Sequence, residues 1–227
     1  RVLIIGAGGH AQVVADILLA MRAAGENIDV AGYLDDAPQR QGMQLLGRPV
    51  LGAIGESGEI DHDGLIVAIG NNAVRRELFL RFQEQGERLV VACHPRATLA
   101  PDVTVGPGTM ICAGAIVNTG ATIGPNAILN TGCTVDHHNR IGAHTHIAPG
   151  AHLGGDVTVG EGTLVGIGAI VLPQTTKATG LSLAVLTASE RARVPDVARR
   201  GLVTVADDRL HLTLPGRLLA DAIIRDL

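Results

Sequence analysis

The fold of this chain is decided by residues 99–171, which read LAPDVTVGPGTMICAGAIVNTGATIGPNAILNTGCTVDHHNRIGAHTHIAPGAHLGGDVTVGEGTLVGIGAIV. An aliphatic residue stands at every sixth position of this stretch, thirteen times without interruption. These positions are Leu99, Val105, Ile111, Val117, Ile123, Leu129, Val135, Ile141, Ile147, Leu153, Val159, Val165 and Val171. A hexapeptide period is typical of a parallel β-helix, in which three hexads make one triangular coil.

The residues around the aliphatic positions fit the same architecture. The residue four places later is usually small, as at Ala115 and Ala127, and glycine often follows the aliphatic residue, as at Gly124. In a β-helix the aliphatic side chains point inward and stack three hexads apart, while Gly and Asn occupy corners with positive φ. We therefore expect a little over four coils, forming a β-helix domain over residues 96–176.

The six-residue period ends after this domain. Residues 177–227 are expected to form a divergent tail, with an apolar helix face at residues 218–223. A β-helix leaves its last coil exposed, so the simplest role for this tail is to cover that coil.

The first 95 residues alternate strand-like and helix-like patterns. Buried strands are expected at residues 1–5, 30–34, 65–69 and 89–92, and helices at 11–24 and 74–85, each helix followed by a glycine. Strands separated by helices favour a parallel sheet. Because four strands make only about one mononucleotide-binding half of a doubly wound fold, residues 1–95 are predicted to form a half-Rossmann-like α/β domain.

Composition excludes several classes of protein. The chain has 18 basic and 22 acidic residues and no basic stripe interleaved with aromatic residues, so no nucleic-acid partner is expected. No uninterrupted apolar run approaches the roughly 20 residues that span a bilayer, so no membrane span is expected.

The chain has three cysteines, Cys93, Cys112 and Cys133, which cannot all pair. None of them forms a C-x-x-C motif, which favours a reducing, cytoplasmic location. Cys133 takes the small position of its hexad, so we expect a packed thiol rather than a nucleophile.

A glycine-rich turn follows the first strand. Residues 6–11 read GAGGHA and match G-x-G-x-x-A, a pattern in which backbone N–H groups at a helix start face anionic phosphates. Asp35 and Asp36 close the second strand, where carboxylates typically bind a ribose or a base. A tight turn without a ligand is the alternative. NAD is the usual ligand of this motif, but the short domain and its fusion to a β-helix favour a nucleotide held by one half-site.

Five of the nine histidines lie within sixteen residues of the β-helix: His137, His138, His144, His146 and His152. Three interpretations compete for this cluster. The imidazoles bind zinc, as in β-helical carbonic anhydrases, or they are surface residues without a role. Alternatively, one of them is a general base, because neutral imidazole accepts a proton near pH 7.

Taken together, these motifs resemble the NeuD/PglD-type sugar acetyltransferases, which O-acetylate sialic acids or N-acetylate nucleotide-linked amino sugars in bacterial glycan synthesis. The segments that carry the resemblance are GAGGH at 6–10, GYLDD at 32–36, GNN at 70–72 with Arg75, HP at 94–95 and DHHNRIG at 136–142. The match covers roughly residues 1–175. It implies a left-handed β-helix, a homotrimer, and acetyl-CoA bound in a groove between adjacent β-helices, with no metal.

The resemblance also implies roles for single residues. His137 is expected to be the catalytic base, with Asp136 and His138 beside it in the catalytic group. His146 is expected near the thioester, with Gly155 and Ile167 along the CoA. The residues expected at the nucleotide sugar are Gly8, Gly9, His10, Asp35, Asp36, Asn71 and Asn130.

Two departures from the family pattern stand out. The position after the base is commonly acidic in relatives, where it can orient the imidazole, but here it is His138. Asp136 or a backbone carbonyl is the alternative partner for the ring. Relatives also continue the hexads further, whereas nothing after Thr176 matches, so distal CoA contacts are not transferred to this chain.

We therefore expect an acetyl-CoA-dependent N-acetyltransferase of a nucleotide-activated amino sugar. The amine attacks the thioester directly while His137 removes a proton and a backbone N–H stabilises the oxyanion. O-acetylation of a sialic-acid-type sugar is the alternative. A zinc-dependent β-helical hydratase and a non-catalytic nucleotide-sugar-binding protein are the alternatives of another class.

Overall fold

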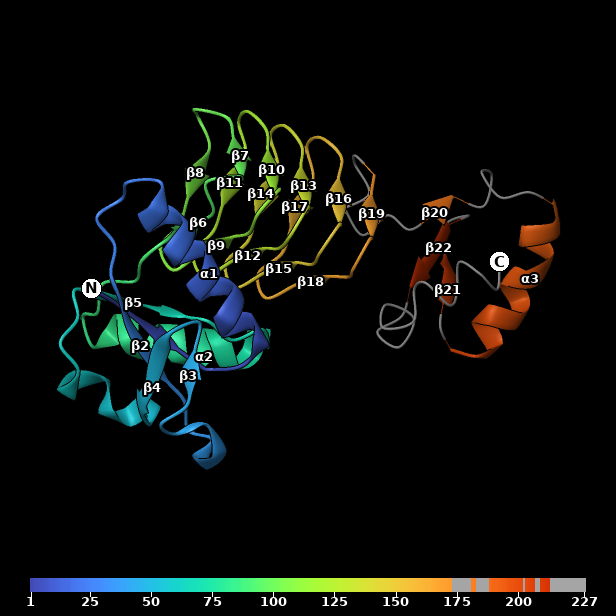
Figure 1. Cartoon of the computed structure of the whole chain (residues 1–227). Coiled ribbons are helices and arrows are strands. Elements are labelled where there is room, and N and C mark those ends of the chain that lie inside the picture. The colour runs from blue at the N-terminus through green and yellow to red at the C-terminus, as the bar shows by residue number, and fades with distance from the viewer. Residues whose placement is uncertain (173–180, 183–187, 202, 207–208, 213–227) are drawn as a thin grey trace. The chain divides into compact units, whose positions relative to one another are not determined.

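The computed structural model describes residues 1–172, 181–182, 188–201, 203–206 and 209–212. The chain divides into two compact units, Arg1–Pro173 and Gln174–Leu227. The first unit holds an α/β sheet with two long helices, followed by a stack of short parallel strands (Figure 1).

The α/β sheet has the strand order β3-β4-β2-β1-β5. Strand β1 pairs in parallel with β2 and β5, β2 pairs in parallel with β4, and the short β3 runs antiparallel to β4. The elements are β1 (Val2–Ile5), α1 (Gly9–Ala23), β2 (Val30–Leu34), the 3-10 helix η1 (Pro38–Arg40), β3 (Gln44–Leu45), β4 (Arg48–Gly52), the 3-10 helix η2 (Ile54–Glu59), β5 (Gly64–Val67) and α2 (Asn72–Glu84). Three of the four predicted strands and both predicted helices are therefore present.

The fourth predicted strand, at residues 89–92, is wrong. Leu89 makes a single parallel bridge to Leu65, and Ala92 already belongs to β6 (Ala92–Cys93), the first strand of the β-helix. The fourth parallel strand of the sheet is β4 instead. It was not predicted, because Pro49 and Gly52 are unfavourable in strands and weaken its sequence pattern. The apolar run at 89–92 is thus a connection between two structures.

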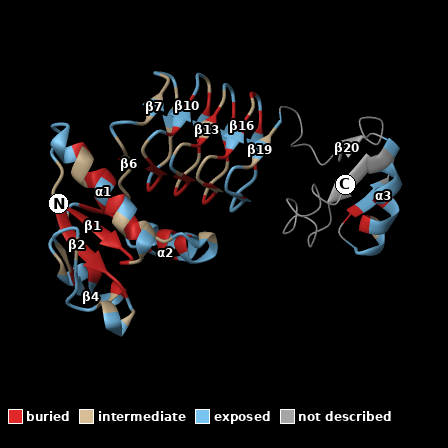
Figure 2. Cartoon of the chain, turned by 45° about the vertical axis from the view of Figure 1, so that its right-hand side comes forward, coloured by how far each residue is buried: buried red, intermediate tan, exposed pale blue. Residues whose placement is uncertain are grey.

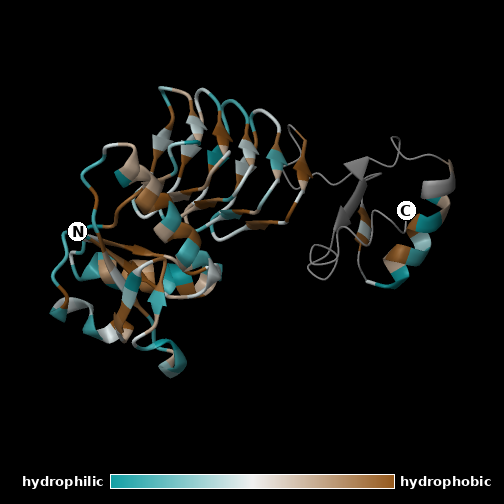
Figure 3. Ribbon diagram, in the orientation of Figure 1, coloured by the Kyte–Doolittle hydropathy of each residue, from teal (hydrophilic) through white to brown (hydrophobic). Residues whose placement is uncertain are grey.

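Helix α1 lies between the sheet and the β-helix. Val14 and Leu18 on α1 belong to one buried cluster with Ile4 of the sheet and with Met110 and Ile128 of the β-helix. The other face of the sheet packs against α2, whose Phe79 and Phe82 are both buried. Figure 2 shows the buried strands of the sheet, and Figure 3 shows hydrophobic and hydrophilic residues alternating around the helices. A shared apolar core therefore fixes the position of the α/β domain on the β-helix.

The β-helix consists of two-residue strands in three parallel sheets. The first sheet contains β7 (Thr98–Leu99), β10 (Ile116–Val117), β13 (Thr134–Val135), β16 (His152–Leu153) and β19 (Ile170–Val171). The second contains β8 (Thr104–Val105), β11 (Thr122–Ile123), β14 (Arg140–Ile141) and β17 (Thr158–Val159). The third contains β6, β9 (Met110–Ile111), β12 (Ile128–Leu129), β15 (His146–Ile147) and β18 (Leu164–Val165), and it is the face toward α1.

The residues at the predicted six-residue period are those whose side chains fill the interior of the β-helix. The aliphatic residues of the hexads stack inside the prism and form its buried core, together with Cys133. Burial raises the pKa of the Cys133 thiol to about 12, so this residue is the packed thiol that its hexad position predicts. Some glycines serve close approach between coils: a Cβ at Gly106 would lie 2.4 Å from the backbone nitrogen of Pro125 in the next coil.

A second six-residue period marks the corners that need positive φ. Residues 108, 114, 120, 126, 132, 138, 144, 150, 156, 162 and 168 all have φ between 56° and 72°. Most are glycine and one is Asn126, as predicted, but His138, His144 and Asp156 also adopt this conformation. Asn, Asp and His tolerate the left-handed region better than most residues. Two of the five clustered histidines therefore occupy corners with an unusual backbone requirement.

The second unit has its own small sheet. Strand β22 (Arg209–Leu212) pairs antiparallel with β20 (Leu181–Ser182) and with β21 (Val203–Ala206), and α3 (Ala188–Arg199) precedes β21. The helix expected at residues 218–223 lies outside the described residues. Within the described part of the chain, no helix combines the length and hydropathy needed to cross a membrane.

Candidate active site

Two adjacent imidazoles lie at the corner between β13 and β14. Nδ1 of His137 is 3.0 Å from Nδ1 of His138, and the two rings meet nearly edge to face at 80°. His138 adopts a positive φ of 59° at this corner. Because a hydrogen bond between two ring nitrogens needs one proton, one of these Nδ1 atoms donates and the other accepts.

Glycines in neighbouring coils make room for both rings. A Cβ at Gly155, one coil after His137, would lie 2.4 Å from the Cε1 and Nε2 atoms of that ring. A Cβ at Gly120, one coil before His138, would lie 2.8 Å from its Cδ2 atom. Both contacts are closer than real Cβ atoms allow, so a side chain at either position would displace the imidazole.

Carboxylates hold the backbone around the pair. Asp136 accepts hydrogen bonds from the backbone N–H of His137 at 2.8 Å and from Asn118 at 2.8 Å. The Asn118 bond, then the His137 bond, keep the pKa of Asp136 below its usual value. Asp102 accepts hydrogen bonds from Thr119 and from the Gly120 backbone, at 2.8 and 2.9 Å. Asp136 thus fixes the main chain of His137 rather than its ring.

The imidazole pair borders an open hollow of about 630 Å³. Its lining residues are Gly120, Thr122, His137, His138, Arg140 and Asp156. Nδ1 of His137 is engaged by His138, so its Nε2 is the ring nitrogen left to meet a bound molecule. Neutral imidazole with a free nitrogen at a hollow is suited to accept a proton.

A second polar cluster lies on the opposite side of the prism, where β15 faces the α/β domain. His146 Nε2 is 2.9 Å from Nδ2 of Asn130, and its ring centroid is 6.3 Å from that of His10 at the start of α1. Burial lowers the pKa of His146 to about 4, and the charge of Arg75 adds to this shift. Burial, then His146, then Arg75 lower the pKa of His10 to about 4. Both rings are therefore neutral at physiological pH.

His10 has a buried ring nitrogen without a partner. Among the described residues, nothing hydrogen-bonds to its Nε2 atom. Buried polar atoms normally find a partner, so this nitrogen marks a place for a ligand group or a water molecule. The predicted substrate residues His10 and Asn130 thus meet around His146, the residue predicted to lie at the thioester.

Arg75 joins the two domains beside this cluster. Its side chain is fully buried and donates to backbone carbonyls of both, including Ile69 at 3.0 Å, Asn126 at 3.1 Å and His144 at 2.9 Å. Burial lowers the pKa of Arg75 to about 10, so the guanidinium stays charged near neutrality. Removing a buried, fully hydrogen-bonded charge is costly, so Arg75 locks α2 onto the β-helix.

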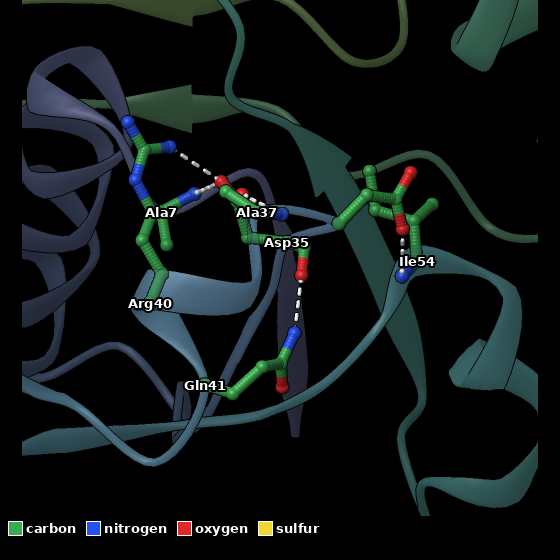
Figure 4. A network of polar contacts seen from close by, with 7 residues as sticks. Ala7, Asp35, Ala37, Arg40, Gln41 and Ile54 are labelled. Carbon is green, nitrogen blue, oxygen red and sulfur yellow. Dashed lines mark hydrogen bonds and ion pairs between the residues drawn. The ribbon is translucent and has the colours of Figure 1, made fainter.

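The glycine-rich turn between β1 and α1 is organised by Asp35 (Figure 4). Its carboxylate accepts hydrogen bonds from the Ala7 backbone at 2.7 Å, the Ala37 backbone at 2.9 Å and Arg40 at 2.7 Å. Burial alone would raise the pKa of Asp35, but these bonds outweigh it and hold the pKa below its usual value. The buried Asp35 therefore braces the turn from beneath.

The space above this turn is open at Gly9, and the Arg40 guanidinium, which is paired with Asp35, lies beside Gly8. A Cβ at Gly8 would lie 3.6 Å from Nη1 of Arg40, and a Cβ at Gly9 would meet nothing within 4 Å. Asp36 is exposed and accepts a hydrogen bond from the Ile54 backbone at 2.8 Å. Helix α1 begins at Gly9, so its free N–H groups and the Arg40 guanidinium face the same region. This arrangement suits an anionic phosphate.

Two other predicted residues are Asn71 and Ile167. Asn71 caps α2, where its side-chain oxygen accepts hydrogen bonds from the backbone of Ala73 at 3.0 Å and Val74 at 3.1 Å. Ile167 is 78% exposed at the corner between β18 and β19. Among the described residues, the Asn71 side chain hydrogen-bonds to the first turn of its own helix and to neither imidazole pair.

Sequence reasoning missed Asn118, Asp102 and Arg40. The first two had a signal, because residues three hexads apart stack: Asn118 bonds Asp136, and Asp102 bonds the backbone of Gly120. Arg40 had none, because its place beside Gly8 depends on the 3-10 helix η1. For the zinc interpretation, the described residues contain no group of three His, Cys, Asp or Glu side chains placed to hold a metal ion.

Comparisons with known proteins point to one class of enzyme. The family described as the PglD N-terminal domain matches residues 1–82. The acetyltransferase domain of PglB from Neisseria gonorrhoeae FA1090, also solved with acetyl coenzyme A, is 37% identical, with 74% of this chain and 80% of that chain covered and a TM-score of 0.68.

A second solved protein shares even more sequence. A variant of perosamine N-acetyltransferase from Caulobacter crescentus, in complex with CoA and GDP-perosamine, is 41% identical, with 76% of this chain and 80% of that chain covered and a TM-score of 0.69. WeeI from Acinetobacter baumannii AYE, at 22% identity and a TM-score of 0.57, shows a likeness of fold alone. A search of curated protein sequences found no match. The predicted fold class, an α/β domain followed by a left-handed parallel β-helix, is confirmed.

Proposed function

The chain belongs to the NeuD/PglD-type sugar acetyltransferases, and we propose that it transfers the acetyl group of acetyl-CoA to the amino group of a nucleotide-linked amino sugar. Two relatives support this activity: the PglB domain has been solved with acetyl coenzyme A, and the perosamine N-acetyltransferase with CoA and GDP-perosamine. The chain is thus an acyltransferase, as the sequence predicts.

The observation that carries this proposal is the placement of His137. Its Nδ1 is occupied by His138, and its Nε2 edge lies above Gly155 at the hollow. A base at this point can accept a proton from an amine that attacks a thioester. We therefore assign His137 as the general base, with His138 and Asp136 holding its ring and its main chain.

The residues proposed for acetyl-CoA fall on two sides of the prism. Gly155 supports the His137 ring, and its missing side chain leaves space beside the base. His146 lies on the third sheet, whereas His137 lies at the corner between the other two sheets. One chain therefore does not bring the base and His146 together.

A neighbouring copy of the chain would complete the site. In this proposal the chain forms a homotrimer with active sites between subunits: one subunit supplies His137, and the next supplies His146, Asn130 and His10. The exposed apolar Ile167 near the last described coil fits a surface that contacts CoA or an adjacent subunit. Symmetric rings place the same two surfaces together at every interface.

The nucleotide is proposed to bind the α/β domain. Backbone N–H groups at Gly8 and Gly9 and the guanidinium of Arg40 face the region above the turn and would hold the diphosphate. Asp36 is exposed at the end of β2 and would contact the ribose or base. Asp35 is occupied by Ala7, Ala37 and Arg40, so its part is to hold the turn in shape.

A direct assay distinguishes the remaining candidates. Purified protein is incubated with acetyl-CoA and either a panel of uridine, thymidine and guanosine diphosphate amino sugars or a sialic-acid-type sugar, and thiol release is followed together with product mass. N-acetylation gives an amide that survives alkaline hydroxylamine, whereas O-acetylation of a sialic-acid-type sugar gives an ester that does not. A nucleotide-sugar-binding protein without catalysis releases no thiol above the rate without enzyme.

A cytoplasmic location, favoured by three free cysteines, is also proposed.

A further inference from the structure

The hydrogen bond between His137 and His138 can exist in two forms. Their Nδ1 atoms are 3.0 Å apart, so a single proton lies between them. If His137 holds this proton, its Nε2 carries a lone pair. If His138 holds it, a neutral His137 carries its proton on Nε2 and has no lone pair for a substrate. Only the first form contains a base at the hollow.

We propose that neutral His138 is a positioning residue: its Nδ1 accepts the Nδ1–H of His137 and so keeps the Nε2 lone pair of His137 available to the substrate amine. This inference rests on the proposed function, in which His137 is the base. The missing side chains of Gly155 beside the first ring and Gly120 beside the second leave the space that the two rings occupy. The 3.0 Å contact between the two Nδ1 atoms is therefore made on a surface shaped by the coils on each side.

The proposed pair fits each bond change of the acetyl transfer. The amine nitrogen forms a bond to the thioester carbonyl carbon, and its proton moves to Nε2 of His137. The carbon–sulfur bond then breaks, and the proton on Nε2 passes to the departing thiolate of CoA. The products are an amide and a free thiol, and both rings return to their starting state. While His137 is charged, its Nδ1–H bond to His138 becomes charge-assisted and stronger.

An excess proton on the free enzyme removes the Nε2 lone pair of His137, whichever of the two rings binds that proton. A proton on Nε2 of His137 occupies the base itself. A proton on Nδ1 of His138 reverses the hydrogen bond, so that His137 must accept at Nδ1 and hold its proton at Nε2. Four of the described charged residues lie around the two imidazoles. They are Asp102 in the preceding coil, Asp136 next to His137 in the chain, and Arg140 and Asp156 at the hollow.

The other corners of the β-helix supply the substitutions that test this inference. Position 138 requires positive φ, and the equivalent corners hold Gly120, Asn126 and Asp156. His138→Asn and His138→Asp keep an acceptor atom on Cγ where His138 has Nδ1, neutral in the first and charged in the second. His138→Gly removes the acceptor without backbone strain. Each variant therefore respects the backbone that the corner needs.

The measurement is the pH dependence of kcat/KM for acetyl transfer by the full chain. We expect the midpoint of the acid limb to rise by about one unit or more in His138→Asp, because a carboxylate favours charged His137. The midpoint should fall below that of the unaltered chain in His138→Asn, which has one imidazole in place of two that can hold the excess proton. His138→Gly should lower kcat by roughly tenfold or more, within the roughly 10²–10⁴-fold contribution of a general base. The KM values should change little.

The outcomes separate this inference from the proposed function. The positioning role would be overturned if the acid limb had the same midpoint in every variant as in the unaltered chain. It would also be overturned if His138→Gly kept the full kcat. In both cases acetyl transfer itself would remain. Absence of acetyl transfer by the unaltered chain would overturn the proposed function instead. Thermal unfolding of each variant identifies any that does not fold, and His152→Asn, at an exposed histidine of β16, serves as the matched control.

Discussion

The imidazole of His137 lies directly against Gly155 of the following coil, where a Cβ would be 2.4 Å from the ring's Nε2 and Cε1 atoms. Gly155 has no positive φ, so its backbone does not require glycine. Glycine at position 155 is therefore explained by the space that the His137 ring needs and not by the backbone conformation of the corner.

Gly155→Ala is predicted to displace the His137 ring and lower kcat by roughly tenfold or more. Gly160→Ala is the matched control, because its Cβ would have only Thr163 Oγ1 nearby, at 3.8 Å. Steady-state kinetics with both substrates measure the effect. Equal activity of the two variants, with both folded, would show that Gly155 does not hold the base in place.

Gly9→Leu is predicted to raise KM for the nucleotide sugar with little change in KM for acetyl-CoA. The fold tolerates the change, because a Cβ at Gly9 meets nothing within 4 Å and this residue is the first of α1. The added side chain instead occupies the space above the N–H groups that are proposed to bind the phosphates. A comparable rise in both KM values would argue that the glycine-rich turn is not a dedicated nucleotide-sugar site.

Two partly buried histidines, His10 and His146, predict how folding stability depends on pH. His10 and His146 have pKa values of about 4 in the folded chain, against an ordinary value of 6.5. Below about pH 6.5 the unfolded chain gains protons that the folded chain does not, so the free energy of unfolding falls as the pH drops toward 4. Urea unfolding at a series of pH values measures this loss.

His146→Asn removes one of these two groups and should make the loss shallower between about pH 6.5 and 4. His152→Asn, at an exposed position, is the comparison variant. If His146→Asn left the slope of unfolding free energy against pH unchanged, His146 would not be a buried neutral residue in solution.

A site shared between subunits predicts complementation. His137→Ala and the double variant Asn130→Ala/His146→Ala are each expected to be weakly active alone. After random subunit exchange, about one quarter of all interfaces would combine an intact His137 with an intact Asn130 and His146, so mixing should restore up to about one quarter of the activity. Mixing that restores nothing, with exchange verified by mass, would place the whole site within one chain.

Most of the fold could be predicted because it repeats. A single coil is marginal, but the six-residue spacing from Leu99 to Val171 recurs often enough to fix the interior and the strand positions. The prediction of a strand at 89–92 was wrong, because a short apolar run can form a strand or a buried connection between two structures. Leu89 makes only one bridge to the sheet. Strand β4 was missed because Pro49 weakens its pattern.

The candidate site could be predicted in part. The repeat places Gly155 one coil from His137 and Gly120 one coil from His138, and the structure shows that both glycines lie against those rings. The contact between His10 and His146 joins residues from two domains, and no local pattern specifies it. The place of Arg40 beside Gly8 likewise depends on tertiary structure.

The most direct measurement is acetyl transfer to a nucleotide-linked amino sugar by the unaltered chain and by His137→Ala. We predict that His137→Ala lowers kcat by about 10²–10⁴-fold with little change in KM, and that the acid limb attributed to imidazole disappears. His152→Ala, treated in the same way, should behave as the unaltered chain. Near-normal turnover by His137→Ala between about pH 6 and 8 would contradict the account, because attack by an already neutral amine would then need no base.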